Sequence, residues 1–307
     1  MTPRQLAMFS GVSAIWGASY LQIKIALDGL DASMVVFGRV LLAAVILYFA
    51  VRTLADHERA LAFGRRHPRE VAVLGLLSIT APFMLISYGE TQISSGLTGI
   101  LVAPGPLFVA LLAPVLDPTE KVDRRGGIGL FLGFAGVVLL LGVDTVGDLG
   151  EFLGGLAVLA AALSYGLGAL YAKQRFTGEG VPALVMSFFS CAAASVMTLP
   201  PALATLPDSS PDLGEIAAVV SLGVVGTALA FVLYYSLIAE TGAGRALLVG
   251  YMIPPAALAY GALLLDEHIT AAAIAGLALI LIGVTLAGRE RRAEPAGETA
   301  PPPPEPA

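Results

Sequence analysis

Cysteine and histidine are scarce in this chain of 307 residues. The single cysteine, Cys191, lies in an apolar run, so an internal disulfide framework is excluded. The three histidines, His57, His67 and His268, all fall in predicted loops. This distribution argues against a buried metal site or a histidine-activated nucleophile. We therefore predict no metal and no cofactor.

Charge and nucleotide-binding motifs are scarce as well. Charged residues make up only 13% of the chain, and the net charge of −6 gives no indication of nucleic-acid binding. The sequence contains no G-x-x-x-x-G-K-[ST] motif, which would cradle the phosphates of ATP. Direct use of ATP by this chain is therefore excluded.

Long apolar runs dominate what is present. Hydrophobic residues make up 57% of the chain, and the mean hydropathy is +0.84. About 20 apolar residues suffice for a membrane-spanning helix, whereas a membrane β-barrel shows alternating segments of roughly ten residues. The uncharged stretch from Gln5 to Ile23 exceeds the core of a signal peptide, about 7–15 residues, so we expect it to be the first span. The sequence predicts an all-α polytopic membrane protein with ten transmembrane helices at 6–27, 32–51, 71–88, 96–116, 126–143, 152–171, 181–199, 216–239, 246–265 and 271–288.

Basic residues fall on one side of these spans. Lys24 and Arg39 lie within spans, and every other Lys and Arg lies on the side of the two termini. The positive-inside rule then places both termini in the cytoplasm. The composition, rich in Ala, Gly and Leu, favours a bacterial cytoplasmic (inner) membrane. The opposite loops carry the acidic residues Asp28, Asp31, Asp144, Asp148, Asp208, Asp212, Asp266 and Glu267.

The two halves of the chain resemble each other. The stretch "GLFLGFAGVVLL" (129–140) matches "GLALILIGVTLA" (276–287), and Glu120 and Glu267 precede them at the same offset. Five spans in each half require the second copy to enter the membrane from the other side, as in many secondary transporters. We predict a first five-helix repeat (1–143), a second, inverted repeat (144–288) and a disordered Pro-rich cytoplasmic tail (289–307), in which a polyproline ligand is an open alternative.

Proline pairs interrupt two predicted spans at similar depths. Pro104 and Pro106 fall in span four, and Pro254 and Pro255 fall in span nine. Each proline removes a helical N–H, so we expect both helices to break near the middle of the bilayer. One interpretation is a polar cavity between the halves, walled by these two spans. The other is that the prolines only kink the helices for packing.

Three charged residues are candidates for an ion-paired cluster on the acidic side of the membrane. Arg39 lies inside span two, where a central arginine costs roughly 2.5–3.5 kcal/mol. Lys24 and Glu90 lie near the ends of spans one and three. Arg39 or Lys24 could bind a substrate carboxylate, and Glu90 could carry a coupling proton. The alternatives are a fixed structural salt bridge for Arg39 and snorkelling to the membrane surface for Lys24.

Aromatic residues on spans one, six, eight and nine are further candidates for substrate contact. Trp16 and Tyr165 occupy matching positions in the two halves, and Tyr20 and Tyr171 could instead belong to an interfacial belt. The glycines of 129–136 are expected to permit close helix packing. The candidate aromatic residues are Trp16, Tyr20, Tyr165, Tyr171, Tyr234, Tyr235 and Tyr251.

The sequence resembles the EamA family of the drug/metabolite transporter superfamily over residues 6–288. The resemblance rests on "AIWGASY", on Arg39, on "PGPLFVALLAPVLDPTE" and on "GAGRALLVGYMIPPAALAYGALLLDE". It implies ten helices in two inverted repeats and export of amino acids, related metabolites or drugs by alternating access. The chain departs from the family pattern at Glu90, where a neutral or apolar residue is more common, and at "DPTEKVD".

We therefore expect a secondary exporter of small organic solutes, with the substrate and the lipid bilayer as its partners. Two alternatives come from other classes: an intramembrane enzyme and a membrane scaffold that transports nothing. The enzyme would need a nucleophile with a base, an acid pair or a metal within the spans. The scaffold would explain neither Arg39 nor the prolines. Assembly as a homodimer and transport without a coupling ion stay open.

Overall fold

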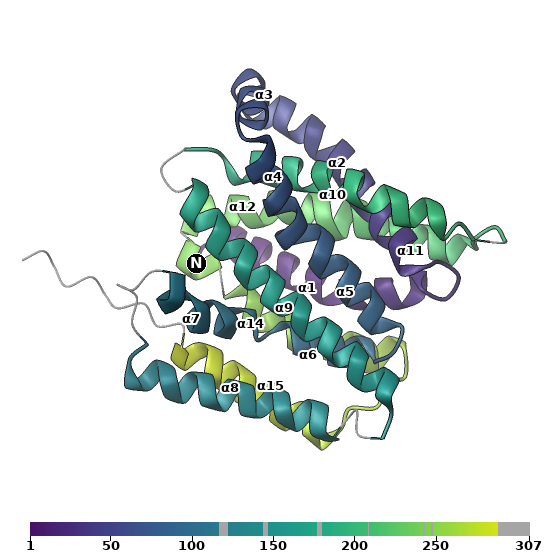
Figure 1. Cartoon of the computed structure of the whole chain (residues 1–307), viewed down its shortest axis with the longest axis vertical. Coiled ribbons are helices and arrows are strands. Elements are labelled where there is room, and N and C mark those ends of the chain that lie inside the picture. Colours follow the sequence, from purple (N-terminus) through teal and green to yellow (C-terminus); the bar gives the residue numbers. More distant parts are fainter. Residues whose placement is uncertain are drawn as a thin grey trace, which may run out of the picture.

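The computed structural model describes residues 1–116, 122–143, 147–176, 180–207, 209–241, 243–246 and 248–287, all in helices and their connections (Figure 1). Glu120 and the predicted tail 289–307 lie outside these residues. The helical elements are α1 (Pro3–Ala26), α2 (Ala32–Leu54), α3 (His57–Arg66), α4 (Pro68–Gly75), the π-helix η1 (Leu76–Thr80), α5 (Ala81–Glu90), α6 (Ser95–Val102), α7 (Gly105–Leu116), α8 (Arg124–Val143), α9 (Leu149–Phe176), α10 (Ala183–Ala204), α11 (Leu213–Gly223), the π-helix η2 (Val224–Leu229), α12 (Ala230–Thr241), α13 (Ala243–Ala246), α14 (Val249–Leu264) and α15 (Ala271–Ala287).

Eight helical stretches of the described residues are long and apolar enough to cross a membrane. They correspond to the first eight predicted spans, and the shorter apolar helices α14 and α15 lie where spans nine and ten were predicted. The prediction of a polytopic all-α membrane protein agrees with this architecture. Membrane-spanning helices are favoured here because they satisfy every backbone polar group internally.

Short polar residues begin several of these helices. Thr2 and Asp212 form capping boxes with Gln5 and Glu215, and the Asp31 side chain accepts from the backbone N–H of Ser33. Such caps satisfy N–H groups that have no partner within the helix. The sequence prediction missed α3, which lies in a stretch expected to be a loop, and the short α13, which begins in another. In α3, Ala60 and Phe63 are buried.

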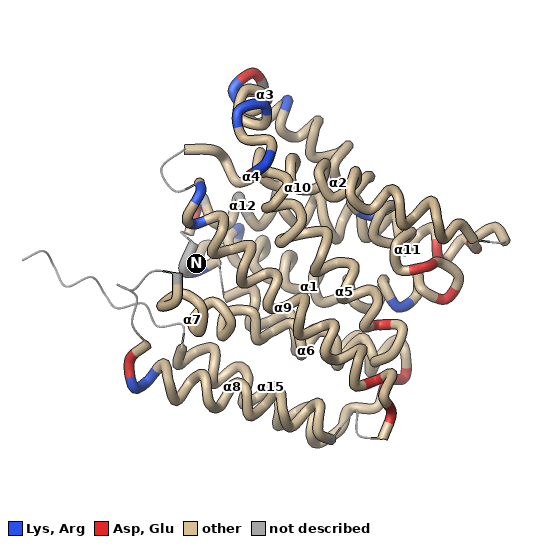
Figure 2. Tube along the Cα trace, viewed as in Figure 1, with Lys and Arg blue, Asp and Glu red and all other residues tan. Residues whose placement is uncertain are grey.

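The two ends of the bundle differ in charge (Figure 2). Most Lys and Arg lie at the end that holds α3, the end of α9 and the start of α8. Asp and Glu gather at the opposite end, around the α5–α6 connection and the starts of α9 and α11. We call these the basic end and the acidic end. The separation matches the one expected from the order of spans and charges.

The two proline pairs have different effects. Helix α6 ends at Val102 and α7 begins at Gly105, so span four breaks at Pro104 as predicted. Helix α14 continues through Pro254 and Pro255, so the predicted break of span nine at that pair is wrong. The discontinuity lies earlier, between α13 and α14. A proline's φ suits a helix, and tertiary contacts hold α14 together beyond the prolines.

Those contacts are close approaches at glycine. A Cβ atom on Gly17 of α1 would lie 2.6 Å from the Cβ of Ala256, and one on Gly99 of α6 would lie 2.4 Å from the Cβ of Ala257. Helix α14 therefore packs directly against the backbones of α1 and α6. Small residues allow this approach between helices in membranes.

Glycines also join α8 and α15, which lie side by side (Figure 1). A Cβ on Gly129 would lie 2.7 Å from the carbonyl oxygen of Gly283, and one on Gly136 would lie 2.7 Å from that of Gly276. These neighbours are backbone atoms, which cannot move aside as the end of a side chain can. The expected role of the 129–136 glycines in close packing is therefore confirmed.

Gly129→Ala is expected to lower the thermal unfolding temperature, because the new methyl group must push α15 away. Overpacking of this kind typically costs about 1–3 kcal/mol. The matched control is Gly127→Ala in the same helix, where a Cβ meets nothing within 4 Å. That change should be neutral or slightly stabilising, since alanine favours helix over glycine. Equal melting temperatures for the two variants would contradict the packing argument.

Candidate functional site

Five residues, one from each of five helices, form a mostly buried polar group, which we call the polar column: Tyr20 of α1, Arg39 of α2, Glu90 of α5, Tyr165 of α9 and Cys191 of α10. The exposed fractions of Arg39 and Tyr20 are 6% and 8%, and Glu90 and Cys191 are fully buried. Tyr20, Glu90, Tyr165 and Cys191 all interact electrostatically with Arg39. Arg39 is therefore the centre of the column.

Arg39 is held by one hydroxyl and one aromatic ring. Its Nε donates to Oγ1 of Thr227 at 2.7 Å, and its Cζ lies 4.0 Å from the centroid of the Phe83 ring. Thr227 belongs to η2, and its own hydroxyl donates to the carbonyl of Leu222, five residues back, at 3.0 Å. Single π-turns within α-helices are frequently found at functional sites. The π-segment thus orients the hydroxyl that receives Arg39.

No carboxylate pairs with Arg39 in the described part of the chain. The salt bridge found there joins Arg4 and Glu240 at the basic end, at 3.3 Å. The predicted ion-paired cluster of Lys24, Arg39 and Glu90 is therefore wrong as to pairing, although both cations interact electrostatically with Glu90. Among the described residues, the guanidinium donates one hydrogen bond, to a hydroxyl, so it has donors left for an anion.

Lys24 has a different role from the two that the sequence suggested. Its Nζ donates to the backbone carbonyls of Glu90 at 2.6 Å and Ile93 at 3.0 Å. It therefore satisfies carbonyls at the end of α5, where a cation also complements the helix dipole. The ammonium group is part-buried, and among the described residues it bonds to these carbonyls and pairs with no carboxylate.

Glu90 is the most unusual member of the column. The residue is fully buried, and neither carboxyl oxygen has a hydrogen-bond partner among the residues that the structure describes. Burial of a carboxylate without a partner is costly, so such a group either holds a proton or receives a cation. Glu90 is therefore a candidate for binding a proton or a cationic group.

The remaining sequence candidates fall elsewhere. Trp16 and Tyr234 lie with their ring centroids 5.1 Å apart, in a cluster with Met8 and Val12. Tyr251 packs on another cluster, to which α6, α7, α8, α9 and α15 contribute, and Tyr171 packs on a further one, around Phe176. Trp16 and Tyr165, favoured as a corresponding pair, thus belong to different clusters. The side chain of Tyr235 lies outside the described residues.

The proline candidates do not join the column either. Pro104 is buried at the break between α6 and α7, where its carbonyl accepts from the N–H of Leu107 at 2.8 Å. Pro254 is buried within α14. The predicted midplane cavity between these helices stays a prediction.

Sequence reasoning missed two contacts of Arg39. Thr227 and Phe83 are ordinary residues within apolar runs, and nothing in their spacing marks them. The interruption of the α-helix at η2 has no proline or charged residue to signal it. Glu267 was noted as a repeat marker and as an acidic loop residue, and its contact with α6 was not predicted.

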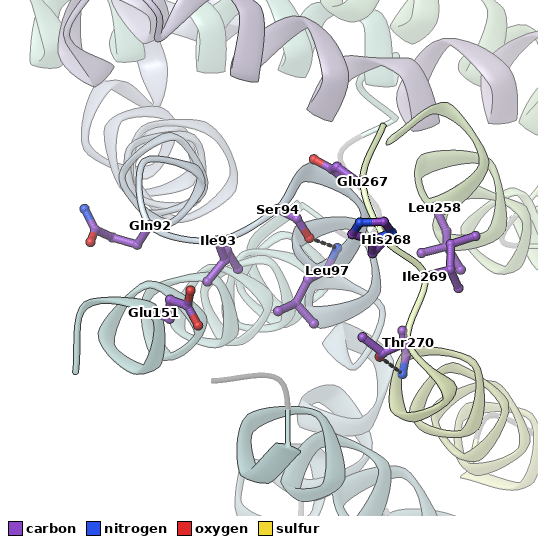
Figure 3. Close-up of a pocket in the computed structure, with 11 residues that line it drawn as sticks. Gln92, Ile93, Ser94, Leu97, Glu151, Leu258, Glu267, His268, Ile269 and Thr270 are labelled. Carbon is purple, nitrogen blue, oxygen red and sulfur yellow. Dashed lines mark hydrogen bonds between the residues drawn. The ribbon is translucent and has the colours of Figure 1, made fainter. Parts of the chain in front are cut away.

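A pocket of about 190 Å³ opens at the acidic end (Figure 3). Polar residues on its wall come from the α5–α6 connection, from the start of α9 and from the α14–α15 connection. They are Gln92, Ser94, Glu151, Glu267, His268 and Thr270.

Comparison with known proteins agrees with this architecture. A model of the EamA-like transporter family matches residues 5–142 and again residues 152–289. The uncharacterized transporter YoaV of Bacillus subtilis is 24% identical over 274 residues, which cover 89% of this chain and 92% of that protein. A probable terminal-alkyne amino-acid exporter of Streptantibioticus cattleyicolor is 27% identical over 285 residues, covering 89% of this chain and 90% of the exporter.

A solved crystal structure shares the fold. It matches with a TM-score of 0.64 at 19% identity, over 92% of this chain and 96% of that one. The helical architecture, the two family matches and the named relatives agree. The chain is a multi-pass membrane transporter and belongs to the EamA-like transporter family.

Proposed function

We propose that this chain is a secondary transporter that exports amino acids, related small metabolites or drugs across the cytoplasmic membrane. It works by alternating access, with the polar column open to one side of the membrane at a time. The name of the Streptantibioticus relative, an amino-acid exporter, supports this substrate class. The names of the relatives favour a transporter over an enzyme.

The observation that carries the proposal is the guanidinium of Arg39, which pairs with no carboxylate among the described residues. A carboxylate accepts two parallel hydrogen bonds from a guanidinium, and this geometry is specific as well as strong. The Phe83 ring and the Thr227 hydroxyl fix Arg39 without neutralising it. In this proposal the substrate carboxylate supplies the missing anion, and Tyr20 and Tyr165 line the same site.

Two inverted five-helix repeats would give this site its two accesses. The family model matches each half of the chain once, which supports a duplicated unit. Helices at equivalent places in the two halves also contact each other, α2 with α10 and α8 with α15. Both termini would then lie in the cytoplasm, with the basic end, as the positive-inside rule requires.

Glu90 is proposed as the carrier of a coupling proton. Its carboxyl group is buried, has no hydrogen-bond partner and interacts electrostatically with Arg39 and Lys24. A proton gradient could therefore drive export where ATP cannot. Without such coupling, the protein would be a facilitator.

Replacement of Arg39 by alanine should reduce counterflow in proteoliposomes loaded with an amino-acid pool. Loss of hydrogen bonds to a charged group costs about 1.5–3 kcal/mol, so we expect roughly a 10- to 100-fold loss of apparent affinity. Arg39→Lys should restore part of it, because lysine keeps the charge without the planar fork. Uptake of each labelled amino acid, measured at several concentrations, gives the affinity.

The matched control is Arg52→Ala, an exposed arginine at the other end of α2. It should leave counterflow unchanged. Undiminished counterflow in a folded Arg39→Ala variant would rule out the polar column as the substrate site, and absence of counterflow for every substrate in the native protein would contradict the proposed transport itself.

Glu90→Gln should separate exchange from coupling. Glutamine keeps the shape of the side chain but cannot bind or release a proton, so counterflow should persist. Accumulation driven by an imposed pH gradient should fall to the level seen without a gradient. The measurement is labelled-substrate uptake with and without the gradient, for both proteins. A pH response equal to that of the native protein would show that Glu90 is not the proton carrier.

A further inference from the structure

Glu267 joins the two halves of the chain at the acidic end. Its Oε1 accepts from the backbone N–H of Ser95 at 2.7 Å, and its Oε2 accepts from that of Gly96 at 2.9 Å. Both donors belong to the first turn of α6, beside which Figure 3 places Glu267. A carboxylate at a helix N-terminus gains from both the free N–H groups and the helix dipole.

The local chain aims Glu267 at α6. The N–H groups of Leu265 and Glu267 both donate to the carbonyl of Gly261 at 3.1 Å, which closes the end of α14. Asp266 between them has φ 52°, a left-handed conformation that non-glycine residues seldom adopt. Gly261 leaves room for the carboxylate, because a Cβ there would lie 2.2 Å from Oε2 of Glu267. The contact is therefore built into the end of α14.

Glu267 lies between the acidic-end pocket and the polar column. On one side it lines the pocket of about 190 Å³ together with Glu151 and His268. On the other it interacts electrostatically with Glu90, the nearest member of the column to this end. Next to it, Ser95 is fully buried, and its hydroxyl has no hydrogen-bond partner within the described part of the chain.

We propose that Glu267 is a positioning residue that holds the acidic end of the transport path closed, and that the pocket is the mouth of that path. The inference rests on the proposed function, since alternating access requires each end to open in turn. Opening at the acidic end must separate α6, in the first half, from the α14–α15 connection, in the second. The two hydrogen bonds of Glu267 span that boundary and can break without disturbing the interior of either helix.

Cys191 provides a reporter of opening. It is fully buried, it belongs to the polar column, and it is the one cysteine of the chain. In intact cells, a thiol reagent that cannot cross membranes should label Cys191 only when the acidic end opens to the outside. Glu267→Gln should raise the labelling rate about tenfold or more, because an amide oxygen can accept from these N–H groups but its NH₂ group cannot. A tenfold change corresponds to about 1.4 kcal/mol.

A second variant reaches the same contact without changing charge. Gly261→Ala places a methyl group where the Glu267 carboxylate lies, and it should raise the labelling rate in the same direction. The matched controls are Glu151→Gln, which removes a carboxylate from the same pocket, and Gly250→Ala, a site in α14 with nothing within 4 Å. Both controls should label as slowly as the native protein.

The outcomes separate this inference from the proposed function. Native-like slow labelling in both folded variants, Glu267→Gln and Gly261→Ala, would overturn it. Faster labelling from the cytoplasmic face of inverted vesicles would also overturn it. Folding is checked by the thermal unfolding temperature, and if Glu267→Gln is unstable, Gly261→Ala decides. Counterflow by the native protein is measured in parallel, so a failure of transport is seen independently of the labelling.

Discussion

The burial of the Arg39 guanidinium inside a membrane-spanning bundle is the constraint on which the candidate site depends. Insertion of a central arginine costs roughly 2.5–3.5 kcal/mol, so it must be stabilised by protein groups or by a ligand. Here the Phe83 ring and the Thr227 hydroxyl do so, from two different segments. Neither group carries negative charge, which is why we propose that the substrate supplies the anion for this guanidinium.

The contacts that organise the rest of the bundle use little apolar driving force. Lipid tails are as apolar as the side chains they replace, so helices in a bilayer associate through close packing and hydrogen bonds. Glycines provide the close packing between α8 and α15, and between α14 and its neighbours α1 and α6. Lys24 and Glu267 provide hydrogen bonds at the acidic end, where each satisfies backbone groups of another segment. Contacts of this kind are local and separable, which suits a protein proposed to open at either end.

Hydropathy alone located nearly all of the helices. It failed at α3, whose stretch is polar apart from a few buried residues, and at Pro254, where tertiary packing kept α14 continuous. The sequence also predicted ion pairs among Lys24, Arg39 and Glu90, because the three residues lie at similar depths along their helices. The depth of a residue along its helix does not determine the direction in which its side chain points. The side chain of Lys24 instead contacts backbone carbonyls.

The sequence by itself determined the class of protein, the placement of its helices, the separation of charge between the two ends and the rare buried charges. These follow from composition and spacing, because a bilayer admits few ways to satisfy a backbone. Only the tertiary structure decided which groups surround each charge: the ring and hydroxyl at Arg39, the unpartnered carboxyl oxygens of Glu90 and the capping of α6 by Glu267. Those contacts join segments far apart in the chain, and their geometry depends on helix rotation and π-turns that no local pattern records.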